Sequence, residues 1–408
     1  MRITFLLTQD LSSPSGLGRY FPWAKELTRL GYDVRIIALH PDFERLSARH
    51  TVMDGVAVDY VGQMHVKKSG STKTYFSLFQ LLWVVFIGTL KLTVAVLAGP
   101  TDLIIIGKPH PMNSIAGLVA KFLRPHTHTI LDVDDYEAGS NRFQSKWQKR
   151  LLAWFEDAMP RYVSMVTCNT HFNMSRLEKL GITAKKMVYL PNGIDADRFK
   201  SPDTGALAQL RKSLGLEYHQ VIAYIGSMSL TNHAVDLLLR AFVAVRSRLP
   251  NARLLLVGGG EDLEKLQKLS NDLGIDDAVI FTGRVDPSQI SLYYALSDLS
   301  VDPVHDDDAA RGRCPLKMFE TWACGVPFIT GDVGDRKGLI GDSSAGLIVL
   351  PGDVANLVNA IIRILEFPET SEMMRRQGFL AVIEFQWTKI TIHFKKEMIS
   401  ILFKRDSN

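Results

Sequence analysis

Two apolar runs that end in glycine decide the fold: VIAYIG at residues 221–226 and RLLLVGGG at residues 253–260. Each run has the length of a buried strand, and residues 234–248 between them carry apolar side chains at helical spacing. A strand, a helix and a second strand in this order form the unit from which parallel sheets are built. We therefore predict a doubly wound α/β domain around these residues.

The alternation of strand and helix continues on both sides of these runs. Downstream, strands are expected at 278–282, 299–303, 327–330 and 347–350. Upstream, they are expected at 3–8 and 33–38, near 57–61 and 102–107, and at 128–133, 164–168 and 187–190. A turn signal at 191–193 and the polar stretch to Gly205 mark a boundary. We predict two Rossmann-like domains, 1–200 and 201–384.

Bulk composition is that of an ordinary globular protein. The 408 residues are 46% hydrophobic and 22% charged, and their number favours two domains. The net charge of +4 is too small to indicate nucleic-acid binding. Cys168, Cys314 and Cys324 form no pair with metal-ligand spacing, which favours reduced thiols, and no secretory signal opens the sequence. We expect a cytoplasmic protein.

Several short segments, taken in order, carry a resemblance to a known family. They are LPNGID (190–195), AYIG (223–226), LLVGGG (255–260), FTGRV (281–285), PLKMFE (315–320) and ACGVP (323–327). With this series the chain resembles a family-four-type glycosyltransferase of the GT-B fold, in which two Rossmann-like domains face a cleft. The segment 385–404 is similar to the family's closing helix, which crosses back onto the first domain.

The PLKMFE segment contains the residues predicted to bind the nucleotide-sugar donor. Pro315 is a natural first helical residue, and Leu316 follows it at a helix start whose N–H groups suit a phosphate. Lys317 adds a positive charge that would stabilise the leaving diphosphate, so it is a catalytic candidate. Glu320 resembles the family's ribose-binding carboxylate; the alternative is a solvated helix residue.

Other donor-side candidates follow from the resemblance. The family holds the nucleotide base by backbone contacts at the strand end that here carries Gly283, Arg284 and Val285, although Arg284 is equally compatible with a surface role. The glycines of the first loop would let its backbone approach phosphate. The remaining candidates are Gly16, Gly18, Gly226 and Ser227.

The sequence departs from the family pattern at two donor positions. The first glutamate of the family's Glu-x7-Glu signature is replaced by Gly312, which puts sugar recognition in doubt. The cations that usually follow the first glycine are absent from residues 227–234. Arg311 and Arg313 are the expected replacements; the alternative is weakened donor binding.

A third departure concerns the acceptor side. Where many relatives have a histidine, this chain has Asp134 and Asp135 at a strand end, and either could orient or deprotonate an acceptor hydroxyl. The cluster with Asp132 also suggests a metal, so Mg²⁺ is possible, but alternating strand residues point apart and favour acceptor binding. Lys108 and His110 are weaker candidates for the same site.

Residues 75–97 are the most apolar part of the chain. Gln80 and Lys91 interrupt the run, and a membrane span would divide the first domain. A buried helix or an interfacial helix remains. Lysines just upstream favour an anionic membrane surface that contacts residues 67–97.

The leading functional prediction, implied by the resemblance, is an enzyme of the hexosyltransferase type. It would move sugar from a nucleotide-diphosphate sugar to a glycan or lipid-linked acceptor, with retention, in cell-surface polysaccharide or glycolipid synthesis. No cofactor would be required. A nucleotide-sugar epimerase and a non-catalytic nucleotide-sugar-binding protein are the alternatives, and we expect a cytoplasmic protein, peripheral on the inner face of the membrane.

Overall fold

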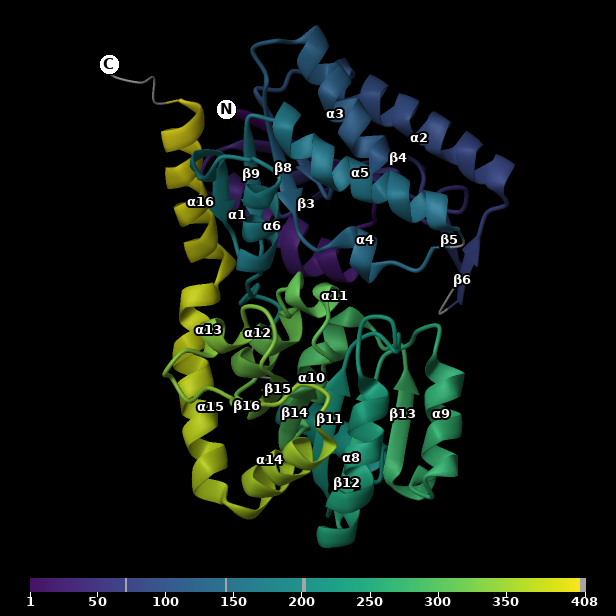
Figure 1. Ribbon diagram of the computed structural model, residues 1–408, viewed down its shortest axis with the longest axis vertical. Coiled ribbons are helices and arrows are strands. Elements are labelled where there is room, and N and C mark those ends of the chain that lie inside the picture. Colours follow the sequence, from purple (N-terminus) through teal and green to yellow (C-terminus); the bar gives the residue numbers. More distant parts are fainter. Residues whose placement is uncertain (70–71, 144, 200–202, 404–408) are drawn as a thin grey trace. The chain divides into compact units, whose positions relative to one another are not determined.

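The computed structural model describes residues 1–69, 72–143, 145–199 and 203–403, whose contacts divide into two compact units (Figure 1). The N-unit comprises Met1–Asn192, Gly312–Cys314 and Trp387–Asn408. The C-unit comprises Gly193–Arg311 and Pro315–Gln386. The domain limits predicted from the sequence, 1–200 and 201–384, stay a prediction.

The N-unit is built on an eight-stranded sheet with the order β10-β9-β8-β7-β1-β2-β4-β3. All neighbours are parallel except β3 and β4. The strands are β1 (Arg2–Leu7), β2 (Asp33–His40), β3 (His50–Met53), β4 (Val56–Gln63), β7 (Leu103–Gly107), β8 (His128–Val133), β9 (Met165–Cys168) and β10 (Met187–Tyr189). A separate antiparallel hairpin pairs β5 (Val66–Ser69) with β6 (Thr72–Tyr75).

Helices flank this sheet, and the last helix of the chain packs on α1. They are η1 (Gly16–Tyr20), α1 (Phe21–Arg29), α2 (Leu78–Ala98), α3 (Pro111–Leu123), α4 (Glu137–Ser140), α5 (Lys146–Tyr162), α6 (His171–Lys179), η2 (Ala184–Lys186) and α16 (Trp387–Leu402). The α16 contact is aromatic: Trp387 stacks on Trp23 with ring centroids 6.3 Å apart, and Phe394 meets the same indole edge-on at 4.7 Å. Burial of these rings joins the C-terminal helix to the N-unit core.

The C-unit has a six-stranded parallel sheet with the order β13-β12-β11-β14-β15-β16. Its strands are β11 (Gln220–Ile225), β12 (Ala252–Val257), β13 (Val279–Gly283), β14 (Leu299–Asp302), β15 (Phe328–Gly331) and β16 (Leu347–Val349). This is the order of the dinucleotide-binding Rossmann sheet, and it reverses between β11 and β14. Ligands of such sheets bind beyond the carboxyl ends of the strands at that reversal.

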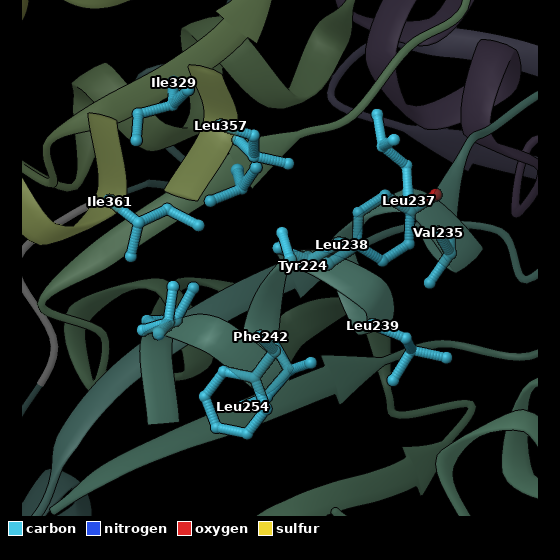
Figure 2. Packing of buried hydrophobic residues seen from close by; sticks show 14 of the residues in the cluster. Tyr224, Val235, Leu237, Leu238, Leu239, Phe242, Leu254, Ile329, Leu357 and Ile361 are labelled. Atoms are coloured by element: carbon cyan, nitrogen blue, oxygen red, sulfur yellow. The ribbon is translucent and has the colours of Figure 1, made fainter. Parts of the chain in front are cut away.

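The C-unit core lies between this sheet and its helices (Figure 2), where Tyr224, Leu238 and Phe242 are fully buried. The helices are α7 (Thr204–Ser213), α8 (Val235–Arg248), α9 (Leu263–Asp272), η3 (Asp276–Ala278), η4 (Pro287–Gln289), α10 (Ile290–Ala295), α11 (Asp308–Arg311), α12 (Leu316–Ala323), α13 (Arg336–Ile340), α14 (Val354–Glu366), α15 (Pro368–Val382) and η5 (Ile383–Phe385). Side chains of α8 and α14 pack together against one face of the sheet.

The predicted class, two doubly wound α/β sheets, is confirmed, while some local predictions need correction. Pro315 is not the first helical residue: its ψ of 109° is extended, and α12 begins at Leu316. Helix α7 begins at Thr204 with Asp203 as its N-cap, so Gly205, the end of the polar stretch, is already helical. The short polar strands β3, β5 and β6 have no apolar run that predicts them.

Candidate functional site

The C-unit gathers glycines at the carboxyl ends of its first strands. Gly226 follows β11 and Gly258 follows β12, and a Cβ on Gly258 would lie 1.9 Å from the Gly226 carbonyl oxygen. Gly258 also has φ of +134°, which only glycine adopts without strain. A Cβ on Gly226 would lie 3.3 Å from Lys317 Nζ. The structure therefore brings the predicted residues Gly226 and Lys317 together at the reversal of strand order.

A buried ion cluster occupies the same place. Lys317 Nζ donates to Asp302 Oδ1 at 2.9 Å, and Arg336 contacts the other carboxylate oxygen, Oδ2, at 3.3 Å. Burial alone would raise the pKa of the Asp302 carboxyl, but the charges of Lys317 and Arg336 outweigh it and hold that pKa below its usual range. One carboxylate with two cations leaves an excess positive charge, which suits a bound phosphate.

Lys317 is the member of this cluster best placed to meet a ligand. Its ammonium lies 4.3 Å from the centroid of the Tyr224 ring, and its side chain is 10% exposed, whereas that of Arg336 is fully buried. Arg336 instead donates to the carbonyl oxygens of Ala310 and Val333. Arg336 therefore ties Asp302 to the backbone at Ala310 and Val333, while Lys317 offers charge at the surface of the site.

Glu320 lies one turn beyond Lys317 on α12 and is not a solvated residue. Its Oε2 accepts a hydrogen bond from the Tyr294 hydroxyl at 3.0 Å. Burial raises the pKa of the Glu320 carboxyl, partly offset by Arg198. A half-buried carboxylate with an oxygen left for a second donor is compatible with binding sugar hydroxyls, so its ribose-binding role stays a prediction.

The other donor-side candidates lie at neighbouring strand ends. Gly283 ends β13 with φ of +67°, and a Cβ on Gly259 would meet the Arg284 side chain at 2.9 Å. Arg284 thus lies along the glycine turn, followed by Val285. The Ser227 carbonyl accepts a hydrogen bond from the Tyr224 hydroxyl at 2.8 Å. These contacts place the predicted residues on one edge of the sheet and leave their roles untested.

The two arginines expected beside Lys317 are engaged elsewhere. Arg311 binds Asp306 at 2.8 Å and Asp308 at 3.2 Å on the surface. Arg313 belongs to the Gly312–Cys314 segment of the N-unit, where its charge partly opposes the rise that burial causes in the pKa of Asp135. The second cation beside Asp302 is Arg336, which sequence reasoning missed because it lies 34 residues from that carboxylate.

The segment that replaces the family's first glutamate is fixed by the N-unit. The Gly312 carbonyl accepts from Asn173 Nδ2 at 3.3 Å, and the Cys314 carbonyl accepts from Asn192 Nδ2 at 2.9 Å. The same Asn192 accepts from Arg19 Nη1 at 2.9 Å. Gly312 contributes a backbone carbonyl here, and no carboxylate stands in its position.

The N-unit has its own charged cluster at a reversal of strand order, between β1 and β7. Lys108, just after β7, reaches Asp135 Oδ2 at 2.8 Å, Glu137 Oε1 at 2.7 Å and Asp134 Oδ2 at 3.4 Å. His110 Nδ1 lies 3.0 Å from the Thr8 hydroxyl, which follows β1, and its Nε2 lies 3.1 Å from Glu137 Oε2. Four predicted acceptor-side residues are therefore brought together: Lys108, His110, Asp134 and Asp135.

Asp134 and Asp135 differ in their surroundings. Asp134 is almost fully buried and lies 3.7 Å from Arg19 Nε. The Asp135 side chain is 23% exposed, and burial, with Asp134 and Glu137 nearby, raises its pKa to about 6 despite the Lys108 charge. A carboxyl with that pKa is partly protonated near neutrality and can exchange a proton with a hydroxyl. Asp135 is the stronger candidate of the two.

The third aspartate of the group is a structural residue. Arg19 donates to both oxygens of Asp132, at 2.6 Å and 2.7 Å, and both side chains are fully buried. Thr167 also donates to Asp132 at 2.6 Å. Within residues 1–69, 72–143, 145–199 and 203–403, no three His, Cys, Asp or Glu side chains are arranged to hold a metal ion. Whether transfer needs Mg²⁺ stays a prediction.

Glu156 supports this cluster from α5. Its two carboxylate oxygens accept the backbone N–H groups of Glu137 at 2.7 Å and Ala138 at 2.8 Å, which holds the start of α4. Burial, and then the charge of Glu137, raises the pKa of Glu156 to about 8. The sequence offers no signal for this role, because Glu156 lies within an amphipathic helix 19 residues from its partner.

The predicted glycines of the first loop have structural partners. A Cβ on Gly16 would lie 2.5 Å from the Asp10 carbonyl oxygen, and the Gly18 carbonyl accepts from Trp387 Nε1 at 2.9 Å. Both residues belong to the π-helical turn η1, not to an irregular loop. Their predicted approach to donor phosphate stays a prediction.

Two glycosyltransferase families match this chain. The "Glycosyl transferase 4-like domain" family matches residues 15–193, and the "Glycosyl transferases group 1" family matches residues 219–366. The chain belongs to the family-four-type glycosyltransferases. This GT-B chain thus has a matched family segment in each of its two units.

Curated relatives and solved structures agree with that assignment. The chain is 30% identical over 226 residues to a GDP-mannose-dependent alpha-(1-6)-phosphatidylinositol monomannoside mannosyltransferase of Mycolicibacterium smegmatis, covering 55% of this chain and 59% of that relative. A D-inositol 3-phosphate glycosyltransferase of Acidothermus cellulolyticus is 28% identical over 51% of this chain and 46% of its own length. The chain thus spans roughly half the length of these relatives.

Solved structures resemble the whole chain. Sucrose-phosphate synthase of Thermosynechococcus elongatus has a TM-score of 0.77 at 19% identity, with 98% of each chain covered. Anabaena HepE in complex with UDP and glucose has a TM-score of 0.73 at 18% identity, covering 97% of this chain and 99% of that one. At this sequence identity the structural similarity shows the fold alone. The similarity extends over both units of this glycosyltransferase chain.

Proposed function

We propose that this glycosyltransferase transfers a sugar from a nucleotide-diphosphate sugar to a lipid-linked or glycan acceptor, with retention, in glycolipid or cell-surface polysaccharide synthesis. The observation that carries the proposal is the buried cluster of Asp302, Lys317 and Arg336 at the reversal of the C-unit sheet. Its excess positive charge faces glycine turns through which a diphosphate can approach the backbone. Charge that develops on the leaving phosphate would be stabilised by Lys317.

Asp135 is the proposed acceptor-side group. Its carboxyl is exposed enough to meet a hydroxyl, and its pKa of about 6 leaves it mainly ionised at neutral pH. Lys108 pairs with Asp135 and is itself held by Glu137. His110 and Asp134 are proposed as orienting residues beside it, since each is engaged with other members of the cluster.

The relatives' names suggest which substrates to test first. GDP-mannose is named for the mycobacterial relatives, and their acceptor is a phosphatidylinositol mannoside. We propose a donor of this nucleotide-sugar type and a glycolipid or inositol-type acceptor for this chain. The enzyme would act on the inner face of the membrane, with residues 67–97 near an anionic lipid surface.

A screen of donors tests the proposal. Nucleotides (GDP, UDP, ADP) and their sugar conjugates, beginning with GDP-mannose, are added in thermal-unfolding assays, and donor turnover is followed with and without membrane extract. We expect stabilisation by one nucleotide class and sugar transfer to extracted lipid. Stabilisation without turnover would favour a non-catalytic binder, a changed free sugar nucleotide would favour an epimerase, and no stabilisation would overturn all three.

The proposal includes transfer without a metal cofactor. Lys317 would supply the charge at the diphosphate that a divalent cation otherwise supplies. We expect turnover to persist in EDTA at the rate measured with added Mg²⁺. A loss of turnover in EDTA that Mg²⁺ restores would show that the metal is required.

A further inference from the structure

Helix α2 presents an unusually apolar outer face. Its exposed side chains recur at helical spacing, with Phe79 84% exposed and Trp83 65% exposed. The series is Phe79, Leu82, Trp83, Phe86, Leu90 and Val94. The opposite face packs on the N-unit through Gly88, Leu92 and Val96. The helix is therefore apolar on both sides, and only one side is covered by the protein.

The apolar surface continues onto two neighbouring helices. Helix α3 packs beside α2, and α5 packs beside α3 (Figure 1). Phe122 on α3 is 82% exposed, and Trp154 on α5 is 61% exposed. The other exposed apolar side chains of α3 and α5 are Ile115, Val119, Leu123, Trp147, Leu151 and Tyr162. We call the outer surface of α2, α3 and α5 the three-helix face.

The tryptophans of the chain fall into two groups, buried ones and exposed ones, and the exposed ones lie on this face. Of six tryptophans, Trp23, Trp322 and Trp387 are fully buried in the two units. The other three, Trp83, Trp147 and Trp154, are exposed, and all lie on the three-helix face. Indole is the side chain that favours the boundary between lipid headgroups and hydrocarbon.

The charge of the three-helix face is basic. Helices α2 and α3 contain no acidic residue, and each has one lysine, Lys91 and Lys121. On α5, Glu156 is buried, and Asp157 pairs with Arg176. The exposed basic side chains of α5 are Lys146, Lys149, Arg150 and Arg161, against one exposed acidic side chain, that of Asp157, which is 43% exposed. Apolar and basic side chains interleaved in this way complement an anionic bilayer surface, whereas a second copy of the chain would set like charges against one another.

The face cannot be a membrane-spanning element. Helix α2 is the one candidate span among the described residues, long and apolar enough by composition alone. The sheet strands before and after it, β4 and β7, belong to the same sheet. A spanning α2 would place these strands on opposite sides of a bilayer and break the sheet. The helix must lie along a surface.

We infer that the three-helix face is a bilayer-docking surface that inserts the side chains of Trp83, Trp147 and Trp154 into the headgroup region of anionic lipid. This inference extends the proposed function, since it places the N-unit on a membrane, but it does not require any sugar transfer. It moves the membrane contact beyond residues 67–97 to include α3 and α5.

Vesicle binding tests the inference. The full chain is floated with vesicles of phosphatidylcholine alone or with phosphatidylglycerol, and quenching of tryptophan fluorescence by brominated lipid is measured. We expect flotation and quenching with the anionic vesicles. The W147S/W154S variant should lose affinity on the order of a hundredfold, because two interfacial side chains are removed. The K146Q/K149Q/R150Q variant should lose roughly a hundredfold at low salt.

Matched controls separate docking from folding and from catalysis. The Y218S/F367S variant removes exposed aromatic residues of the C-unit, 90% and 50% exposed, and should bind vesicles like the wild type. All variants should keep the thermal stabilisation given by nucleotide, which shows that the donor site is intact. The inference is overturned if wild type and all variants float equally with anionic vesicles, or if no protein floats. Concentration-dependent dimerisation that the α5 substitutions abolish while no protein floats also overturns it.

Discussion

The two units place charged clusters at the same topological position but give them opposite sign. In each sheet the cluster lies where the strand order reverses, between β1 and β7 in the N-unit and between β11 and β14 in the C-unit. The C-unit surrounds one carboxylate, Asp302, with Lys317 and Arg336. The N-unit surrounds one ammonium, Lys108, with three carboxylates.

The difference shows that one fold can prepare two kinds of chemistry at equivalent positions. An excess of buried positive charge is relieved by an anion such as a diphosphate. An excess of buried negative charge is relieved by protonation. Burial, with the charges of neighbouring carboxylates adding to it, raises the pKa of Asp135 to about 6 and that of Glu156 to about 8. The function thus follows from the site and not from the shared topology.

The largest effect in the N-unit is expected from Arg19, which pairs with Asp132 and lies 3.7 Å from Asp134 of the cluster. Arg19→Met leaves Asp132 buried and unpaired, so the free energy of unfolding should fall by about 3–5 kcal/mol. Urea unfolding followed by circular dichroism measures it. Arg2→Met, which breaks the exposed Arg2–Asp102 pair at 2.7 Å, is the matched control and should have little effect. Equal destabilisation by both substitutions would contradict the structural role of Arg19.

Removal of Lys317 tests the C-unit cluster, because it takes away the excess positive charge beside Asp302. Lys317→Met leaves Asp302 and Arg336 as a neutral pair, so the chain should fold while kcat/KM for the nucleotide sugar falls about 100- to 1000-fold. Lys337→Met is the control, because Lys337 is exposed and belongs to the same unit. Wild-type nucleotide affinity and turnover in Lys317→Met would show that the phosphate binds elsewhere.

The sequence predicts the scaffold of both clusters better than their members. Strand–helix alternation and the glycine-terminated runs predict both sheets, and the PLKMFE segment predicts Lys317 and Glu320. Asp302, Arg336 and Glu156 were missed because no local pattern marks them. Each acquires its role from a partner distant in sequence, 34 residues away for Arg336 and Asp302. Such pairings follow from how strands order in the sheet, which local periodicity does not encode.

The departures from the family pattern illustrate the same limit. Because the usual cations after Gly226 are missing, we predict Arg311 and Arg313 as their replacements. These are the arginines nearest to Lys317 in the sequence. The structure instead places Arg336, from the start of α13, beside Lys317 and Asp302. Arg311 meets carboxylates only a few residues away. The predicted phosphate-binding roles of Arg311 and Arg313 stay predictions, and Arg336 is a cation beside Asp302 that no local sequence pattern marks.

Asp135 tests whether the negative cluster acts on the acceptor. Because its folded pKa is raised to about 6, the carboxylate form that could accept a proton is lost as pH falls through 6. The rate of transfer should decline below that pH, and Asp135→Asn should reduce it about 100-fold while removing this limb of the profile. Asp134→Asn is the comparison. An unchanged acidic limb in Asp135→Asn would assign the titration to another group.

The smallest expected effect comes from Glu156, which bears on the cluster only through the start of α4. Above about pH 8 the Glu156 carboxylate accepts both backbone N–H groups, at Glu137 and Ala138. There Glu156→Gln leaves one of them without an acceptor, which costs about 1–3 kcal/mol of unfolding free energy. The pKa of Glu156 is raised from 4.5 to about 8, so the folded state keeps a proton that the unfolded state releases. Wild-type stability should therefore fall as pH rises from about 5 to 8, by up to about 1.4 kcal/mol per pH unit from this group. Urea unfolding at several pH values should show a shallower decline in Glu156→Gln. Equal slopes in both proteins would show that Glu156 is ionised in the folded state and that its contacts with α4 stabilise the carboxylate.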